Sequence, residues 1–600
     1  MTAAVQTLWA ELIAASLVDA GVATCVVSPG SRSTPLVAAL ANERRLELVP
    51  IIDERSAAFF ALGVARATGV PAAIVCTSGS AAAHYLPAIV EASTAAIPLV
   101  VVTADRPPEL QNCGATQTID QIKLYGTFVR GAFDLGAPVG SESALRAVRR
   151  TVIRAVVLAR GPHAGPIQLE VPLRKPLEPA VPSTDGERAL ARVSAELRAQ
   201  RVVAAPPTLV ADSAAIDELA IAIANEPRGV IVAGAMPLGF ARARSAMFEL
   251  AARAGYPILA EAGSQLKLAA RGRAVVVARA DFAMAAGARP PRLVIELGAE
   301  PVAAARPSFA GAARWVLSDH EWRDPDGSAR GVIVGDVGAT IVALAGRLDG
   351  GGLSPAGSAA AWRRGSLEPR GGELAASWRE VDDRCAVAVD AALAAHPRSE
   401  TAVMRAAVEA LPAGAIIQIG NSLPIRVVDH AIGHGRAHGV ITQRGAAGID
   451  GLISSAAGAT RAGAPVLLVL GDVSFAHDLG GLLAARAASA PLAILVLDNA
   501  GGQIFAGLPI ASAGLDSVVE RYFVTAPQLD PVAVAVALGA RAITAGSAAS
   551  AAAAVATALA SPGVTVIHAP VTATGAHDVR RYVLDLLAAP TRASAGVAHV

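Results

Sequence analysis

The chain has 600 residues, of which 53% are hydrophobic, 17% charged and 4% aromatic. This length suits about three to four domains, and the composition excludes a disordered chain or a coiled coil. Lysine and arginine total 51 against 50 aspartates and glutamates, a formal net charge of +1, so no global field attracts nucleic acid or an anionic membrane.

Three features of the sequence indicate the cellular location of the protein: the N-terminal segment, the apolar runs and the cysteines. Residues 1–20 carry Glu11 within an apolar pattern and lack a basic start, which predicts a first helix rather than a signal peptide. The strongly apolar runs have strand length, so no membrane span is expected. None of the cysteines forms a C-x-x-C pair, and we expect reduced thiols and a cytoplasmic protein. The cysteines are Cys25, Cys76, Cys113 and Cys385.

The first part of the chain alternates short β-branched runs with helical patterns. Turns of small residues follow several of these runs, which is typical of buried strands that lead into helices. The predicted strands cover residues 23–27, 48–52, 72–76 and 99–103. The predicted helices cover residues 55–68 and 81–94.

Two changes of composition divide the rest of the chain. Residues 172–207 indicate a linker with a surface helix, and residues 350–372, rich in Gly, Ser and Pro, indicate a second linker. The strands predicted between and after the linkers cover residues 229–233, 257–260, 292–297, 314–317, 465–470 and 493–497. Strands that alternate with helices form parallel sheets covered on both faces. We therefore expect three doubly wound α/β domains, at about residues 1–180, 205–345 and 375–585.

Several common site motifs are missing from these strand ends. No lysine follows a glycine, which excludes a P-loop, and no strand leads into G-x-G-x-x-G. A G-x-S-x-G elbow between a strand and a helix is also absent, so a hydrolase triad has no basis.

Oxygen-bearing side chains follow two consecutive strands of the third domain. Asp472 follows residues 465–470 after Gly471, and Asn499, 27 residues later, follows residues 493–497. Two such oxygens with a turn carbonyl suit Mg²⁺, which keeps water and phosphate oxygens in its other positions. The alternative is an Asp helix cap and an Asn turn, and position alone favours that alternative.

Longer sequence motifs help to choose between a metal site and a helix cap with a turn. Gly471-Asp472 followed by Asn499 resembles the metal–diphosphate motif of thiamine-diphosphate enzymes, whose pyrimidine-binding, central and diphosphate-binding domains are all α/β. The further strings are SPGSRSTPL from residue 28, TADRPPEL from 103, GATQ from 114, GNS from 420, RGAAGIDG from 444 and GGQIF from 501. This set resembles the MenD family, the 2-succinyl-5-enolpyruvyl-6-hydroxy-3-cyclohexene-1-carboxylate synthases of menaquinone biosynthesis.

The resemblance implies an activity. The family consists of transferases, carboligases that decarboxylate 2-oxoglutarate on thiamine diphosphate and add the remaining four-carbon unit to isochorismate. The products are 2-succinyl-5-enolpyruvyl-6-hydroxy-3-cyclohexene-1-carboxylate and CO₂. The implied cofactors are thiamine diphosphate and Mg²⁺, or Mn²⁺ in its place. Two substrates that each carry two carboxylates suit arginine, whose planar fork binds a carboxylate with two hydrogen bonds.

The resemblance also implies roles for individual residues. Glu54 would contact the aminopyrimidine ring as the catalytic residue, although its position alone fits a helix N-terminal glutamate equally well. The other implied cofactor contacts are Ser78, Gly79, Asp472, Ser474, Asn499, Gly502 and Ile504. The implied metal ligands are Asp472, Asn499 and the carbonyl of Gly501. The implied substrate contacts are Ser422, Arg426 and Arg444 for 2-oxoglutarate, Arg32, Arg106 and Gln117 for isochorismate, and Phe505.

The chain departs from the family pattern at four places. The family often has Asn where this chain has Gly480 and Thr116. An Asn pair is replaced by Asp498-Asn499, and since the later Asn is the implied ligand, we expect Asp498 to be a neutral change. In the middle domain, the family usually has several basic residues after a strand that ends in Leu-Gly. This chain has only Arg306 there, which is the least secure of the implied substrate contacts.

Two other functions remain open, and the resemblance also implies an oligomeric state. The chain could be another thiamine-diphosphate-dependent 2-oxo-acid decarboxylase or carboligase, or a non-catalytic nucleotide-binding protein on the same fold. The arginines argue against a decarboxylase of an apolar acid, which needs an apolar pocket. The resemblance implies a homodimer or homotetramer, in which each site forms between the first domain of one subunit and the third domain of another.

Overall fold

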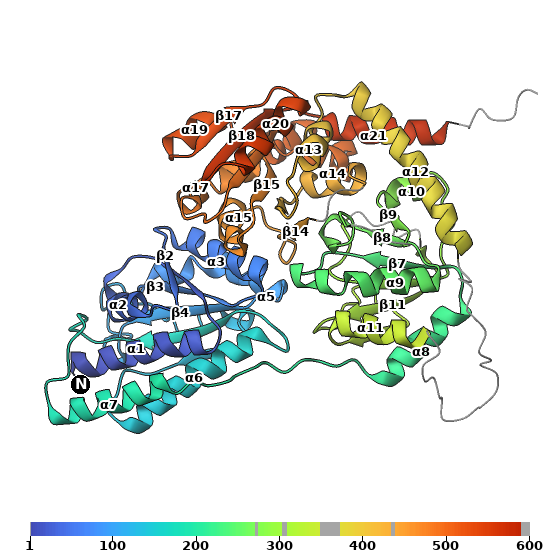
Figure 1. The fold of residues 1–600 in the computed structure, drawn as a ribbon. Coiled ribbons are helices and arrows are strands. Elements are labelled where there is room, and N and C mark those ends of the chain that lie inside the picture. The colour runs from blue at the N-terminus through green and yellow to red at the C-terminus, as the bar shows by residue number, and fades with distance from the viewer. Residues whose placement is uncertain (1, 270–273, 303–308, 349–371, 434–437, 590–600) are drawn as a thin grey trace, which may run out of the picture.

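The computed structural model describes residues 2–269, 274–302, 309–348, 372–433 and 438–589. Within these ranges the chain forms three six-stranded parallel sheets with helices packed against them (Figure 1). This architecture confirms the predicted fold class, three doubly wound α/β units. Among the described residues, the helices that are long enough to span a bilayer are too polar to do so.

The first sheet, in blue and teal in Figure 1, has the strand order β2-β1-β3-β4-β6-β5. Its strands are β1 Thr24–Val27, β2 Glu47–Pro50, β3 Ala72–Cys76, β4 Leu99–Asp105, β5 Ala132–Asp134 and β6 Ile167–Pro172. The helices are α1 Ala3–Asp19, α2 Thr34–Asn42, α3 Glu54–Thr68, α4 Ser80–Ala83, α5 Leu86–Thr94, α6 Glu142–Arg160 and α7 Asp185–Ala199.

Alternate residues of the strands β1, β3 and β4 enter two separate cores. Val26 of β1 packs in the core that contains Phe59 of α3, whereas its neighbours Cys25 and Val27 pack in the core that contains Leu12 of α1. Both faces of the sheet are therefore covered by helices at these strands, which explains why they are nearly continuous hydrophobic runs.

The middle sheet, in green, has the order β12-β11-β10-β7-β8-β9. Its strands are β7 Gly229–Ala233, β8 Ile258–Ala260, β9 Val276–Val277, β10 Leu293–Leu297, β11 Ala313–Ser318 and β12 Gly331–Val334. The helices are α8 Ser213–Asn225, α9 Arg244–Ala254, α10 Ala280–Ala285 and α11 Val337–Leu348.

The third sheet, in orange and red, has the order β14-β13-β15-β16-β18-β17. Its strands are β13 Ile416–Ile419, β14 Gly439–Thr442, β15 Val466–Gly471, β16 Leu492–Asp498, β17 Arg541–Thr544 and β18 Val564–Pro570. The helices are α12 Gly372–Ala395, α13 Glu400–Glu409, α14 Leu423–Ala431, α15 Leu452–Ala459, α16 Asp472–His477, α17 Gly481–Ala485, α18 Asp516–Val519, α19 Pro531–Ala537, α20 Ala548–Leu559 and α21 Gly575–Ala588.

Two predicted segments differ from the structure. The helix expected over residues 81–94 is divided into α4 and α5, and α5 starts afresh with Pro87 in its first turn, where proline needs no hydrogen-bond partner for its nitrogen. The surface helix of the first predicted linker is α7, whose Leu197 is buried in the core of the first unit with α1. Most of the second predicted linker lies outside the described residues.

The first and third units of one chain meet where α3 crosses α15. The crossing depends on two glycines, because a Cβ on Gly63 would collide with the carbonyl of Ser455 and one on Gly458 with that of Phe60. Backbones can approach this closely only where no side chain intervenes. The start of α3, which carries Glu54, thereby lies against the third unit, with a carboxylate oxygen of Asp53 beside Gly480.

Candidate active site

The two predicted side-chain ligands of the cation lie at one edge of the third unit's sheet. β15 and β16 pair in parallel, with Gly471 opposite Leu497. Asp472 therefore follows β15 at the edge where Asn499 follows β16. The carboxyl ends of parallel strands, where helices begin, form the usual ligand-binding edge of such sheets.

Asp472 is the first residue of α16, and 5% of its surface is exposed. The backbone N–H of Gly501 donates to its Oδ2 at 2.7 Å, which joins the turns after the two strands. Burial, and then the charge of Asp498, raise the pKa of Asp472 to about 6. A bound cation would favour the charged carboxylate and offset this cost.

Asn499 presents an oxygen with no partner. Its Nδ2 donates to Oε2 of Glu400 at 2.6 Å, whereas its buried Oδ1 accepts no hydrogen bond from the residues that the structure describes. An amide oxygen beside a carboxylate fits a hard cation such as Mg²⁺. The oxygens of Asp472 and Asn499 therefore suit a divalent metal ion.

The turn after β16 requires glycine. Gly501 has φ +115°, and a Cβ there would collide with the carbonyl of Val524. Its carbonyl accepts from the N–H of Gln503 at 2.8 Å, and one lone pair remains for a further partner. The role of this carbonyl as a metal ligand stays a prediction. The N–H of Gly502, a predicted cofactor contact, donates to Val524 at 2.6 Å.

Asp498 is more than a neutral replacement. Its Oδ2 lies 2.9 Å from Nε2 of His568 on β18, and its charge contributes to the raised pKa of Asp472. The extra carboxylate thus adds negative charge beside the predicted cation site and is partnered by an imidazole from the next strand. The sequence motif alone showed neither effect.

The predicted 2-oxoglutarate residues form one cluster on the third unit. Ser422, at φ +73°, lies in the left-handed region that L-residues rarely adopt, which is a strain typical of functional sites. Its carbonyl accepts from a guanidinium nitrogen of Arg426 at 2.7 Å, and Arg444 donates to Oδ1 of Asn421 at 3.2 Å. Burial, and then the charge of Arg444, lower the pKa of Arg426, so the two guanidinium groups lie close enough to repel each other.

The predicted isochorismate residues form a second cluster on the first unit. Arg32 is 3% exposed and donates to the carbonyl of Leu173 at 2.6 Å. Burial, and then the charge of Arg106, lower the pKa of Arg32. Gln117, also in the left-handed region at φ +57°, donates to the carbonyl of Ser78 at 3.0 Å. Arg106 donates to the carbonyl of Thr116 at 3.2 Å, so the Asn-to-Thr departure leaves that backbone contact intact.

Gly79 and Ser78 also belong to this cluster. The N–H of Gly79 donates to Oε1 of Gln121 at 2.9 Å, and a Cβ on Gly79 would press on the side chain of Gln117. Ser78 is 1% exposed, and its hydroxyl has no partner among the described residues. A buried free hydroxyl of this kind suits a contact with a bound molecule.

Glu54 begins α3 and is partly buried. The preceding residue, Asp53, caps the helix by accepting from the N–H of Arg55 at 3.0 Å, so Glu54 is free of the capping role. Its charge lies near Cys76 at the end of β3: burial and then Glu54 raise the pKa of that thiol. Glu54 therefore lies at the carboxyl edge of the first sheet, as the sequence predicted.

A cavity of about 280 Å³ lies beside the third unit's arginine cluster. Its lining includes Arg426, Ile504 of the turn after β16, and His577 and Arg580 of α21. His577 lies 2.8 Å from the carbonyl of Gln503 and so ties α21 to this turn. Phe505, next in the turn, packs edge-on against Phe523 with ring centres 5.0 Å apart. None of the lining residues comes from the first unit, so Glu54 does not reach this cavity within one chain.

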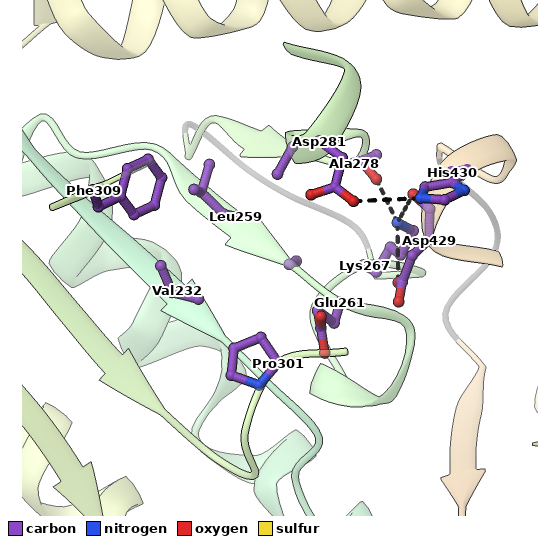
Figure 2. Close-up of a pocket in the computed structure, with 12 residues that line it drawn as sticks. Val232, Leu259, Glu261, Lys267, Ala278, Asp281, Pro301, Phe309, Asp429 and His430 are labelled. Carbon is purple, nitrogen blue, oxygen red and sulfur yellow. Dashed lines mark hydrogen bonds and ion pairs between the residues drawn. The ribbon is translucent and has the colours of Figure 1, made fainter. Parts of the chain in front are cut away.

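A smaller pocket lies between the middle and third units, and side chains that line it hold α14 in place (Figure 2). Lys267 is 1% exposed and donates to the carbonyls of Ala278 and Asp429, at 2.5 and 3.0 Å. The N–H of Ala262 donates to Oδ1 of Asp429 at 2.6 Å. These contacts fix the end of the helix that carries Arg426.

Some functional candidates were missed, and one falls outside the structure. Glu400, Asp498 with His568, and His577 emerge only from tertiary contacts. Ser474, by contrast, is 5% exposed on α16 at the predicted edge. Arg306 lies outside the described residues.

Two family models match the outer units of the chain. Residues 9–124 match "thiamine pyrophosphate enzyme, N-terminal TPP binding domain", and residues 426–569 match "thiamine pyrophosphate enzyme, C-terminal TPP binding domain". Each arginine cluster lies within or beside one of these ranges. The protein is therefore a thiamine-diphosphate-dependent enzyme.

Solved structures share the fold. Benzoylformate decarboxylase from Polynucleobacter necessarius superposes with a TM-score of 0.67 at 17% identity, covering 94% of this chain and 98% of that one. A thiamine diphosphate-dependent 4-hydroxybenzoylformate decarboxylase from Rhodococcus jostii RHA1 gives 0.67 at 19% identity, covering 94% and 99%. At these identities the likeness establishes the three-unit fold alone.

Curated relatives are closer. A protein of Sorangium cellulosum named 2-succinyl-5-enolpyruvyl-6-hydroxy-3-cyclohexene-1-carboxylate synthase is 41% identical, over 97% of both chains. Proteins with the same name from Myxococcus xanthus and Halobacterium salinarum are each 38% identical, the first over 89% of both chains, the second over 97% of this chain and 98% of its own. The chain therefore belongs to the 2-succinyl-5-enolpyruvyl-6-hydroxy-3-cyclohexene-1-carboxylate synthase family, the carboligases of menaquinone biosynthesis.

Proposed function

We propose that this protein decarboxylates 2-oxoglutarate and joins the remaining four-carbon unit to isochorismate. The product is 2-succinyl-5-enolpyruvyl-6-hydroxy-3-cyclohexene-1-carboxylate, the compound in the names of its relatives. One observation carries the proposal beyond those names: each cofactor-binding unit holds its own arginine pair, Arg32 with Arg106 and Arg426 with Arg444. Two separate cationic clusters suit two substrates that each bear carboxylates.

The cofactor is held mainly by the edge of the third sheet. Asp472 and the Oδ1 of Asn499, with the carbonyl of Gly501, would bind Mg²⁺ or Mn²⁺, and Ser474 and Gly502 would contact the diphosphate. Ile504 would support the cofactor between its two rings, and Ser78 and Gly79 would contact it from the first unit. Thiamine diphosphate supplies the electron sink that accepts the negative charge left by decarboxylation.

The chain's own residues bind the substrates and move protons. Arg426 and Arg444, with Ser422, hold the carboxylates of 2-oxoglutarate, and Phe505 covers this side of the site. Arg32, Arg106 and Gln117 hold isochorismate. Glu54 accepts and returns a proton at its carboxylate, the one acidic group of the first unit expected at the pyrimidine ring. Arg306 would add a further substrate contact.

The site is shared between subunits of a homodimer or homotetramer. Glu54 does not line the cavity that contains Ile504 and Arg426 of its own chain. A two-fold dimer places the first unit of one subunit over the third unit of its partner and forms two equivalent sites. We also infer a cytoplasmic location, since the four cysteines form no disulfide in the structure.

The rival is a thiamine-diphosphate decarboxylase that lacks an acceptor substrate. Its fold would be the same, but a decarboxylase of an apolar acid has no use for two arginine pairs. The test incubates the purified protein with Mg²⁺, thiamine diphosphate, 2-oxoglutarate and isochorismate, followed by mass analysis. We expect the mass of the joined product, its loss when isochorismate is omitted, and no product when Asp472→Ala replaces the wild type. CO₂ release with no joined product would support the rival.

A further inference from the structure

Glu400 is a buried carboxylate that belongs to none of the matched motifs. It is the first residue of α13, directly after the capping residue Ser399, and only 1% of its surface is exposed. The backbone dipoles at a helix N-terminus favour a negative charge. Burial of a carboxyl group nevertheless costs free energy unless its oxygens are bound, so the position calls for a specific partner.

That partner is Asn499, 99 residues later in the chain. Nδ2 of Asn499 donates to Oε2 of Glu400 at 2.6 Å. A side-chain amide has one donating and one accepting end, and here the donating end is held by Glu400. Oδ1 must then point away from Glu400, and it is the buried oxygen with no partner among the described residues. Turning the amide over would set Oδ1 against a carboxylate oxygen and lose this bond.

We propose that Glu400 is a positioning residue of the cation site. By accepting from Nδ2 it sets which end of the Asn499 amide faces the site, so that Oδ1 is the atom offered to the metal. Glu400 itself does not touch the cation. The inference rests on the proposed role of Asn499 as a metal ligand. Groups that orient a metal ligand in this way change metal affinity by roughly 10–100-fold when they are removed.

A pair of variants of similar size separates this role from simple packing. Glu400→Met removes the acceptor and keeps the volume, whereas Glu400→Gln retains a carbonyl oxygen that can accept from Nδ2. Glu409→Gln, at the exposed far end of the same helix, is the matched control. The probe is Mn²⁺, with its free concentration measured by electron paramagnetic resonance at saturating thiamine diphosphate. The melting temperature of the metal-free protein is recorded for every variant.

The methionine variant is expected to raise the Mn²⁺ dissociation constant by about 10–100-fold, and the glutamine variant by less than about threefold. Because Glu400 acts through Asn499, the double variant Glu400→Met with Asn499→Ala should bind Mn²⁺ no more weakly than Asn499→Ala alone. If the methionine variant fails to fold, Glu400→Asp replaces it: the shorter side chain keeps the charge but withdraws the oxygen from Nδ2, so it should weaken Mn²⁺ binding similarly.

Other results overturn the inference in distinguishable ways. Unchanged Mn²⁺ affinity in the methionine variant, with a weakened Asn499→Ala, removes the positioning role and leaves the metal site standing. Equal weakening by methionine and glutamine, in step with a lower melting temperature, makes Glu400 structural only. Unchanged affinity in Asn499→Ala overturns both the proposed ligand and this inference.

Discussion

The first and third sheets share one topology and carry different chemistry. Their orders, β2-β1-β3-β4-β6-β5 and β14-β13-β15-β16-β18-β17, correspond strand for strand. The equivalent strands β4 and β16 both end in an aspartate, Asp105 or Asp498. The next residue is Arg106 in the first unit and Asn499 in the third, a cation in one and a predicted ligand of a cation in the other.

The comparison teaches that the scaffold selects where ligands bind and leaves the residue types to decide what binds. After β3 the first unit continues with Thr77, Ser78 and Gly79, small residues without charge. After the equivalent β15 the third unit continues with Asp472, a buried carboxylate with a raised pKa. With the proposed roles, the first edge would bind isochorismate and supply one proton acceptor, and the third unit would bind the metal, the diphosphate and 2-oxoglutarate. Four predictions test this division, in order of decreasing effect.

The largest effect is expected at Glu54, the predicted proton acceptor of the first edge. Glu54→Gln conserves size and removes the proton acceptor, so activity should fall by roughly 10²–10⁴-fold while the fold and cofactor affinity persist. Exchange of the cofactor's C2 proton, followed by NMR, is the direct measurement. Normal exchange in a cofactor-loaded variant would show that Glu54 is not the activating group and serves only as a helix N-terminal carboxylate.

The arginine clusters should divide by substrate. Arg426→Ala and Arg444→Ala should lower kcat/KM for 2-oxoglutarate, and Arg32→Ala and Arg106→Ala should lower it for isochorismate. Each loss should be about 2–3 kcal/mol, because a charge-assisted contact in a partly buried site is removed. Steady-state kinetics with each substrate varied in turn measures the division. If all four variants lost kcat/KM equally for both substrates, the two arginine clusters would not be specific for different substrates.

A buried carboxyl beneath the first edge should make stability depend on pH. Glu170 of β6 is 3% exposed and accepts from Thr103 and, at 3.1 Å, from Gln121. Burial, followed by the charge of Asp105, raises its pKa to about 8. The folded protein therefore holds a proton there that the unfolded chain has released above its ordinary pKa, so this contribution to stability falls as pH rises from about 4.5 towards 8.

Glu170→Gln should remove that slope. Between about pH 5.5 and about pH 8 the wild type should lose at least about 1 kcal/mol of unfolding free energy relative to the variant. Thermal midpoints at the two pH values provide the measurement, with the exposed Glu142→Gln as the control. Parallel pH profiles for wild type and Glu170→Gln would mean that the carboxyl is ionised in the folded protein.

Mixed dimers test whether the two edges belong to different subunits. In a dimer of Glu54→Gln with Asp472→Ala, one composite site carries both defects and the other carries none. Such dimers should recover about half the wild-type activity per dimer, measured on heterodimers purified with two different tags. Heterodimers as inactive as both parents would place Glu54 and Asp472 of one chain in the same site.

The repeating pattern of buried strands and turns determined the fold class and the ends of some strands, whereas β2, predicted over residues 48–52, covers Glu47–Pro50. β3 and β7 begin and end where the pattern predicted, and Asp472 and Asn499 lie at one edge because adjacent parallel strands end together. Strand patterns are local, since a short apolar run bounded by turn residues is enough to mark a buried strand. The residues of the implied site are therefore visible in the sequence as strings at strand ends.

Tertiary structure alone decided which side chains those strings contact. Glu400 lies 99 residues from Asn499 and His568 lies 70 from Asp498, and neither stands in a string that marks a site. Nothing local distinguishes Glu400 from any glutamate in the first turn of a helix. Glu400 becomes buried and accepts from Asn499 only when the start of α13 packs against the end of β16. Packing between distant parts of the chain, and not local helix propensity, decides which polar groups are removed from water and need a hydrogen-bond partner.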